Sequence, residues 1–104
     1  MNSGTPRSRD KLLRALLLLN HHLDKKPLQF ALVLAFVAGR PGISFQDILA
    51  LSDVSKASLS RIMAWHEEAG LVITRPMPDD RSSKVAYLTP KGEKFVNEVW
   101  AVLD

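Results

Sequence analysis

The segment of residues 55–69 constrains the fold more than any other, because it has the pattern of one helix with two unlike faces. Apolar side chains recur at helical spacing and predict a buried face: Val54, Leu59, Ile62 and Met63. Short polar and cationic side chains lie opposite, near the N-terminal end: Ser55, Lys56, Ser58, Ser60 and Arg61. Such a face suits a DNA major groove, since small residues allow close approach and a long cation reaches phosphates or guanine edges. A solvated surface helix has the same composition, so the neighbouring segments must decide between the two interpretations.

The preceding segment predicts a shorter helix over residues 44–51. Ser44 is suited to cap this helix, with Asp47 three residues later as a weak capping box. Three apolar side chains should anchor the helix to the core: Ile48, Leu49 and Leu51. A tight turn at residues 52–54 then leads into the longer helix. Two short helices joined in this way predict a helix-turn-helix over residues 44–69.

Two extended segments follow the helix-turn-helix. Gly70 suits the end of the preceding helix, and residues 71–74 and 84–88 are rich in β-branched and other apolar side chains. The sequence between them, RPMPDDRSS, predicts a hairpin loop that is too long for a tight two-residue turn. A helix-turn-helix followed directly by such a hairpin predicts a winged helix, with its wing at residues 71–88.

Two helices should precede this unit. The first covers residues 8–23, and Pro27 is suited to be the first residue of a second that ends at Gly39. The second is apolar nearly all round, so it should form the centre of the core. Ile43 then begins a short strand.

A last helix should cover residues 89–103, capped by Thr89 and with Pro90 at its first position. The predicted fold class is therefore α+β, mainly α: a winged helix-turn-helix with an added N-terminal helix and a C-terminal helix. We expect one domain over residues 8–104, preceded by a flexible N-terminus of residues 1–7.

The helix of residues 8–23 carries more leucine than one core-facing stripe needs. Six leucines form one stripe and the start of a second: Leu12, Leu16, Leu19 and Leu23, then Leu13 and Leu17. The surplus favours a partner subunit on one side of this helix. The alternative is a central helix that is buried within its own domain.

Charge and composition bound the function. Lys and Arg total 14 against 11 Asp and Glu, for a net charge of +3, which permits a nucleic-acid partner without requiring one. The absence of cysteine excludes disulfides and thiolate metal sites formed by this chain. The apolar runs are too short to span a bilayer, so we expect a soluble, cytoplasmic protein with no membrane partner.

The sequence does not favour an enzyme. It contains no glycine-rich phosphate loop, pair of catalytic carboxylates or nucleophile–base set. His21 and His22 are neighbours on a helix and point about 100° apart, so they cannot chelate one metal together. A zinc sensor would need one of them with Asp24 and a distant group. We expect no enzymatic activity, no cofactor and no metal.

Residues 28–92 resemble the MarR family of bacterial winged-helix transcription regulators. Three pieces carry the resemblance: SDVSKASLSRIM in the second helix of the helix-turn-helix, EEAGLV at its exit, and PDDRSSKVAYLTPKG in the wing and the next helix. The helix pieces are shared with many helix-turn-helix families, whereas the wing followed by LTPKG is more diagnostic. The resemblance implies that Arg81 lies near the wing tip, beside the minor groove. It also implies DNA contact by the polar residues of the helix: Ser55, Lys56, Ser58, Ser60 and Arg61.

The sequence departs from the family pattern in three places. The family's wing usually has an Asp followed two places later by Arg, but Ser82 takes that place after Asp80, and Arg81 replaces the arginine only in part. His66 stands where relatives usually carry an apolar core residue, so it is either a satisfied core histidine or a sensor. Only a short tail follows Thr89, so a homodimer would form through the N- and C-terminal helices, or the protein would be a monomer.

The predicted partner is double-stranded DNA, with the recognition helix (residues 55–69) in the major groove and the wing at the minor groove. The candidate DNA-binding residues are Ser55, Lys56, Ser58, Ser60, Arg61, Arg75, Arg81 and Lys84. Asp79 and Asp80 lie among these cations. One of them could hydrogen-bond Arg81 or Arg75 and fix its direction, or they form the turn, and the two roles are compatible.

The rival function is a protein-interaction module, such as an adaptor or antirepressor without DNA binding. Trp65 and Trp100 would serve such a module if exposed, because tryptophan often anchors protein interfaces; otherwise both are ordinary core residues. Relatives often bind aromatic or phenolic effectors between the dimer helices and the winged domain. The sequence identifies no pocket for a small-molecule effector here.

Overall fold

The computed structural model describes residues 6–104, so residues 1–5 of the predicted flexible segment lie outside the described part. Pro6 and Arg7 are the first residues of a helix. The elements are, in order, α1 (Pro6–His22), α2 (Leu28–Gly39), β1 (Ile43–Ser44), α3 (Phe45–Leu51), α4 (Lys56–Glu68), β2 (Val72–Met77), β3 (Asp80–Leu88) and α5 (Pro90–Leu103). The predicted class, a mainly helical α+β winged helix with added terminal helices, is confirmed.

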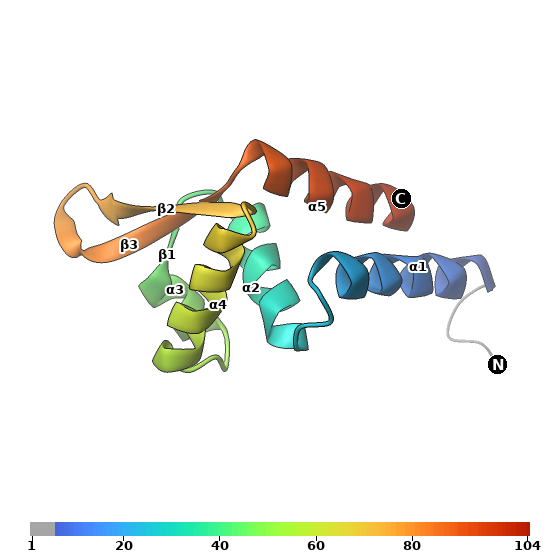
Figure 1. Ribbon diagram of the computed structural model, residues 1–104, viewed down its shortest axis with the longest axis horizontal. Helices are drawn as coiled ribbons and strands as arrows, with labels where there is room; N and C mark the ends of the chain where they lie inside the picture. The colour runs from blue at the N-terminus through green and yellow to red at the C-terminus, as the bar shows by residue number, and fades with distance from the viewer. Residues whose placement is uncertain (1–5) are drawn as a thin grey trace.

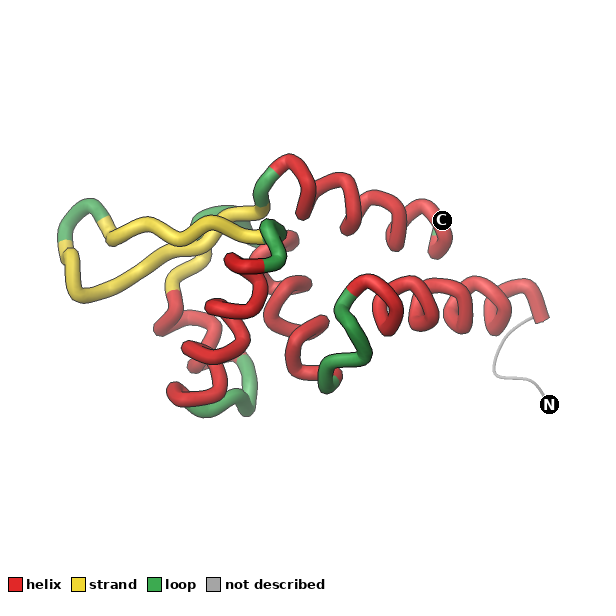
Figure 2. The backbone as a smooth tube through the Cα atoms, in the orientation of Figure 1, coloured by secondary structure: helices red, strands yellow, loops and turns green. Residues whose placement is uncertain are grey.

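The molecule has a winged body and an arm (Figures 1 and 2). The body contains α2, α3, α4 and the sheet, from which the β2–β3 hairpin projects as the wing. The arm consists of α1 and α5, which lie side by side in opposite directions and extend away from the wing. At its far end the Lys11 ammonium donates to the Asp104 carbonyl oxygen at 2.7 Å. The arm makes the molecule elongated, 51 × 27 × 22 Å.

The core lies between α2 and α4. The buried side chains of α2 are Phe30, Val33, Leu34 and Val37. The predicted buried face of the recognition helix is confirmed, with Val54, Leu59, Ile62 and Met63 each at most 5% exposed. These contacts leave the opposite side of α4 free.

One prediction about the core is wrong, since Leu51 does not anchor α3, and a second holds only in part. Helix α2 does lie at the centre of the core, but Leu28 is 76% exposed and Leu32 41%. The reason is the direction of α1: the connection to α2 passes through two residues with positive φ, Asp24 and Lys25, and α1 joins the arm instead of covering α2. Leu51 is also exposed, since it is the last residue of α3 and the chain turns there toward α4.

The three-stranded sheet has the order β1-β3-β2, with antiparallel neighbours. The prediction of a long wing loop is wrong. Strand β2 continues to Met77 and β3 starts at Asp80, so only a two-residue turn joins them. Regular pairing runs as far as Pro76 opposite Lys84, and the next pair joins Met77 to Asp80. Since proline has no N–H to donate to the ladder, Pro76 is a suitable place for the register to shift.

The end of α4 is joined tightly to the start of α5, and we call residues 69–71 and 89–92 the α4–α5 joint. Gly70 ends the helix with φ +79°, as its position in the sequence predicts. The Thr89 hydroxyl donates to the Gly70 carbonyl at 2.5 Å, and the Lys91 ammonium donates to the Ala69 carbonyl at 2.8 Å. The Thr89 hydroxyl oxygen also accepts from the Gly92 N–H at 3.0 Å, which confirms the predicted cap of α5. The carbonyl groups at the end of the recognition helix are thus bonded to the arm.

The leucine surplus of α1 is mostly exposed. Ala15 and Leu23 are buried, but Leu12, Leu13, Leu16 and Leu17 are each about half exposed, from 47% to 57%. A single chain therefore does not bury α1 as a central helix, and that alternative is wrong. Among residues 6–104, no helix has the length and apolar character needed to cross a membrane.

Candidate nucleic-acid interface

The recognition helix exposes a broad polar face. Ser55 caps α4, and its hydroxyl oxygen accepts from the Ser58 N–H at 3.1 Å, so this side chain first serves the helix end. At about 100° per residue, Ser60 lies roughly 40° from Lys56 around the helix and Arg61 roughly 140°. Lys56 and Arg61 thus mark the two edges of this face, and the small side chains of Ala57 and Ala64 lie between them and are exposed. A second backbone or a nucleic-acid groove can therefore approach the helix closely.

Arg61 is exposed and holds a loose contact with Ser58, whose hydroxyl oxygen accepts from the arginine Nη2 at 3.5 Å. This distance lies beyond the usual range of a strong hydrogen bond. The guanidinium therefore keeps its donors available to a ligand at little cost.

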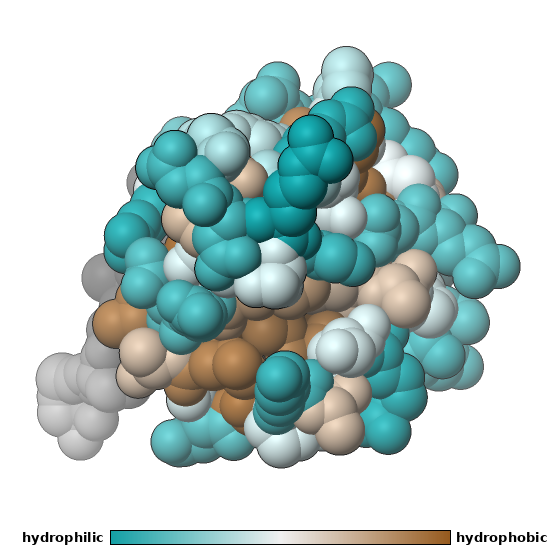
Figure 3. Space-filling view, turned by 90° about the vertical axis from the view of Figure 1, so that its left-hand side faces the viewer, coloured by the Kyte–Doolittle hydropathy of each residue, from teal (hydrophilic) through white to brown (hydrophobic). Residues whose placement is uncertain are grey.

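A cleft of about 290 Å³ separates the recognition helix from the wing. Its lining residues are Phe45, Gln46, Leu49, Lys56, Leu59, Ser60, Ser82, Ser83 and Lys84. Figure 3, which faces the wing end, shows hydrophobic side chains gathered within a hydrophilic rim. Lys56 and Ser60 of α4 thus share one concave surface with Lys84 of β3. Folding thus brings Lys84 together with two predicted site residues that are more than 20 positions earlier in the sequence.

The other predicted site residues do not line this cleft. Arg75 and Arg81 are exposed on the wing, and the Arg75 Nη1 donates to the Thr74 carbonyl oxygen at 3.2 Å. Two further cations of the winged body and its joint are engaged in contacts within the chain. Arg40 forms an ion pair with Asp47 at 2.7 Å, and Lys91 belongs to the α4–α5 joint.

The two wing aspartates have different surroundings. Asp80 accepts hydrogen bonds from Ser82 and Ser83, so the turn-forming interpretation fits it, whereas within the described residues it makes no direct hydrogen bond to Arg75 or Arg81. The Ser82 hydroxyl, followed by the Ser82 N–H and the Ser83 hydroxyl, lowers the pKa of Asp80 below its ordinary value. Within residues 6–104, Asp79 receives no side-chain hydrogen bond. Asp side chains commonly bond the backbone two residues further on, which is the turn-forming role that the sequence analysis offered.

The tryptophans differ in their exposure. Trp65 packs on the core edge-to-face with Phe30, with ring centroids 5.8 Å apart, and the Lys26 ammonium lies 5.7 Å from its ring. Trp65 is therefore a packing residue. Trp100, on the arm, is 47% exposed.

His66 is fully buried in the core contact between α4 and α2. Its Nε2 lies 2.8 Å from the Phe30 carbonyl oxygen, so Nε2 carries the proton and donates. Its Nδ1 is buried without a hydrogen-bond partner among the described residues. A core histidine is thus confirmed, but only one of its two nitrogens is satisfied. Desolvation lowers the pKa of His66 below 6.5, and the hydrogen bond to Phe30 offsets this in part.

We expect acid to destabilise the fold through His66. The unfolded chain takes up a proton near pH 6.5 while the folded chain does so only at lower pH, so stability is full above 6.5 and falls as the pH drops below it. The loss should approach about 1.4 kcal/mol per pH unit until the folded pKa is reached. Urea unfolding between pH 7.5 and 5.5 measures it. The His66→Leu variant should have a flatter profile over this range; equal profiles would contradict the assignment.

The two helices α3 and α4 and the adjoining wing define a winged helix-turn-helix protein. A family model described as "MarR family" matches residues 27–81. A putative transcriptional regulatory protein for the hcr operon of Thauera aromatica is 30% identical over 60 residues, which are 58% of this chain and 36% of that protein. The match thus spans about a third of this relative. The chain belongs to the MarR family, whose members are transcription regulators and not enzymes.

Solved structures share the fold at low sequence identity. The crystal structure of MarR has a TM-score of 0.70 at 22% identity, over 90% of this chain and 70% of that one. A mutant of S. aureus MepR bound to an oligodeoxyribonucleotide has a TM-score of 0.76 at 21% identity, over 93% and 70%. The repressor CouR bound to a 23-mer DNA duplex has a TM-score of 0.68 at 22% identity, over 91% and 68%.

Proposed function

We propose that this chain is a sequence-specific, double-stranded-DNA-binding transcription regulator. The observation that carries the proposal is the shared cleft, which combines Lys56 and Ser60 of the recognition helix with Lys84 of the wing. Two structural neighbours bound to DNA have the same fold, which supports this partner. In the proposed complex α4 enters the major groove and the wing lies along the minor groove.

The exposed cations would make different contacts with the DNA. Lys84 and Arg75 on the strands of the wing suit phosphate contacts, which supply affinity that falls with salt. Arg61 and Lys56 at the two edges of the exposed α4 face suit guanine contacts in the major groove. Arg81 suits a narrow, A·T-rich minor groove, where the negative potential is strongest.

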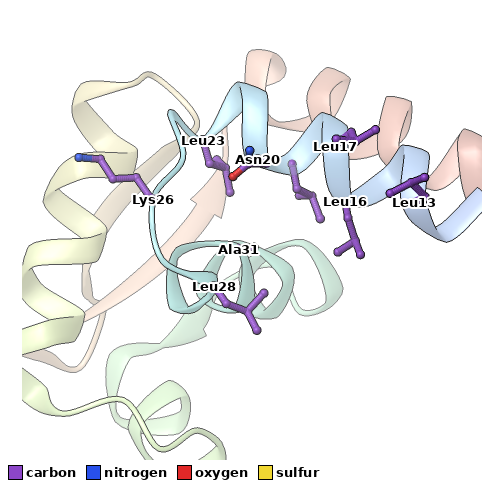
Figure 4. A pocket seen from close by; sticks show the side chains of 9 residues that line it. Leu13, Leu16, Leu17, Asn20, Leu23, Lys26, Leu28 and Ala31 are labelled. Carbon is purple, nitrogen blue, oxygen red and sulfur yellow. The ribbon is translucent and has the colours of Figure 1, made fainter.

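We propose that the active form is a homodimer through the arm. Three of the four exposed leucines of α1 (Leu13, Leu16 and Leu17) border an apolar groove of about 360 Å³ between α1 and α2 (Figure 4). The groove is lined by Leu13, Leu16, Leu17, Leu19, Asn20, Leu23, Lys26, Leu28 and Ala31. A two-fold partner would cover this surface and place two recognition helices about 34 Å apart, suited to a near-palindromic site.

Arg61→Ala and Lys84→Ala should affect DNA binding differently. Arg61→Ala should weaken binding to the preferred duplex, because it removes a base contact. The difference in binding free energy between the preferred duplex and other duplexes should fall by about 1–3 kcal/mol. Lys84→Ala should weaken all duplexes alike and reduce the slope of log affinity against log salt by about one. Titrations against a duplex selected from a random pool and a scrambled duplex, at several salt concentrations, measure both effects.

Lys94→Ala is the matched control, because it removes an exposed charge from α5 outside the cleft. It should leave base preference unchanged and alter the salt slope less than Lys84→Ala does. Unchanged binding in both site variants would remove Arg61 and Lys84 from the interface.

The exposure of Trp100 favours one other candidate, a protein-interaction module without DNA binding. The two functions differ in a mobility-shift experiment at low and physiological salt. A regulator should retain a selected duplex at physiological salt, whereas an adaptor should retain none.

A further inference from the structure

Strand β3 has a bulge in the wing, and Arg81 is one of its residues. From Val72 opposite Leu88 to Pro76 opposite Lys84, the pairs follow one register. In that register Met77 would face Ser83, but it pairs with Asp80 instead. Residues 81–83 are therefore extra residues on β3. Bulges of this kind change the direction of side chains and are frequent beside functional sites.

One carboxylate closes the bulge. The Asp80 Oδ1 accepts from the Ser82 N–H at 3.0 Å and from the Ser82 hydroxyl at 2.6 Å, and its Oδ2 accepts from the Ser83 hydroxyl at 3.0 Å. We call this group the Asp80 clasp. Arg81 lies between the residue that accepts these bonds and the residues that donate them, so the clasp fixes the backbone on both sides of it. Hydrogen bonds to an ionised acceptor are stronger than neutral ones, which favours a single bulge conformation.

We propose that Asp80 is a positioning residue for DNA binding: through Ser82 and Ser83 it holds Arg81 in the direction that the DNA contact requires. The inference rests on the proposed function. It explains why an acidic residue lies beside an exposed arginine of the wing, where its charge alone opposes a DNA phosphate. Asp80 therefore has two opposite effects on binding, repulsion by its charge and support through the clasp.

The neighbouring carboxylate of Asp79 separates these effects. Asp79 is also exposed and is adjacent to Asp80, and no hydrogen bond to its side chain occurs within the described residues. Asp79→Ala and Asp80→Ala change the net charge by the same amount at adjacent positions. Only Asp80→Ala opens the clasp.

The test is titration of each variant against one labelled duplex selected by the wild type. Asp79→Ala should bind about twofold to fivefold tighter, because it removes one screened surface charge that repels the DNA phosphates. Asp80→Ala should bind about tenfold weaker, as expected when a charge-assisted contact is lost. Asp80→Asn keeps an oxygen that accepts from Ser82, so it should restore binding to at least the wild-type level.

Two further variants show whether Asp80 acts through the clasp and through Arg81. The double variant Ser82→Ala/Ser83→Ala removes the donor hydroxyls without changing the charge, and it should bind more weakly than wild type. In an Arg81→Ala background, Asp80→Ala should no longer weaken binding and should behave like Asp79→Ala.

Equal effects of Asp80→Ala and Asp79→Ala in the wild-type background would overturn the clasp while leaving the proposed function standing. A persistent loss from Asp80→Ala in the Arg81→Ala background would overturn the role of Arg81. A wild-type chain that retains no duplex would refute the proposed function itself, and with it any role of the clasp on DNA.

Discussion

Gly92→Ala is expected to lower the free energy of unfolding by about 3 kcal/mol or more, since no small adjustment accommodates the added methyl group. A Cβ at this position would lie 2.1 Å from the Leu71 carbonyl oxygen and 3.0 Å from its carbonyl carbon. Both are backbone atoms in the α4–α5 joint, so one element would have to move away from the other. Urea unfolding followed by far-ultraviolet circular dichroism measures the loss.

Gly39→Ala is the matched control for this substitution. Gly39 also lies in a helix, but nothing is found within 4 Å of its added Cβ. Alanine should be neutral there or stabilise by about 0.4–1 kcal/mol, because it restricts the unfolded chain. A Gly92→Ala variant as stable as the Gly39→Ala variant would contradict the close contact in the joint.

The second large effect concerns the arm. The double substitution Leu13→Gln/Leu17→Gln should convert a dimer to a monomer and lower affinity for a two-half-site duplex by roughly 10²- to 10⁴-fold, the factor lost when two linked sites act separately. Both side chains are more than half exposed in the single chain, at 56% and 57%, so the fold of the monomer should be little affected. Light scattering at micromolar concentration gives the mass, and titration gives the affinity.

Leu51→Gln provides the control for the mass measurement. Leu51 is 58% exposed, as much as the arm leucines, but it lies on α3 in the winged body. It should leave the dimer intact. A monomeric mass for the wild-type chain at the same concentration would exclude assembly through the arm.

The α4–α5 joint connects the arm to the recognition helix. The Ala69 and Gly70 carbonyl groups, at the end of the recognition helix, are both bonded to residues at the start of α5. The direction of α5 is therefore tied to the direction of α4. In the proposed dimer, the same joint would help set the separation of the two recognition helices.

Local sequence rules predicted the helices and, to within two residues, their ends, because the relevant interactions lie within a few residues of each other. Two predicted caps are confirmed: the Ser44 hydroxyl accepts from the Asp47 N–H at 3.0 Å, and Thr89 makes the equivalent bond at α5. Ser55, which was predicted only as a DNA contact, caps α4 in the same way. The two faces of the recognition helix follow from the 3.6-residue period in the same way. The candidate DNA contacts stay predictions, since exposure and charge are necessary for them but do not demonstrate binding.

Tertiary structure decided what depends on contacts between distant segments. The wing register depends on Pro76, which is opposite Lys84, and on the bonds of Asp80, and loop composition alone suggested a longer loop. His66 is buried because α2 packs over it. A side chain at position 92 is excluded because folding places the Leu71 backbone against Gly92 in the α4–α5 joint. The sequence by itself therefore determined which residues form each helix and which side each presents, because backbone hydrogen bonds and periodicity are local. Only folding determined which polar and cationic side chains share a surface, because that depends on packing between segments far apart in the chain.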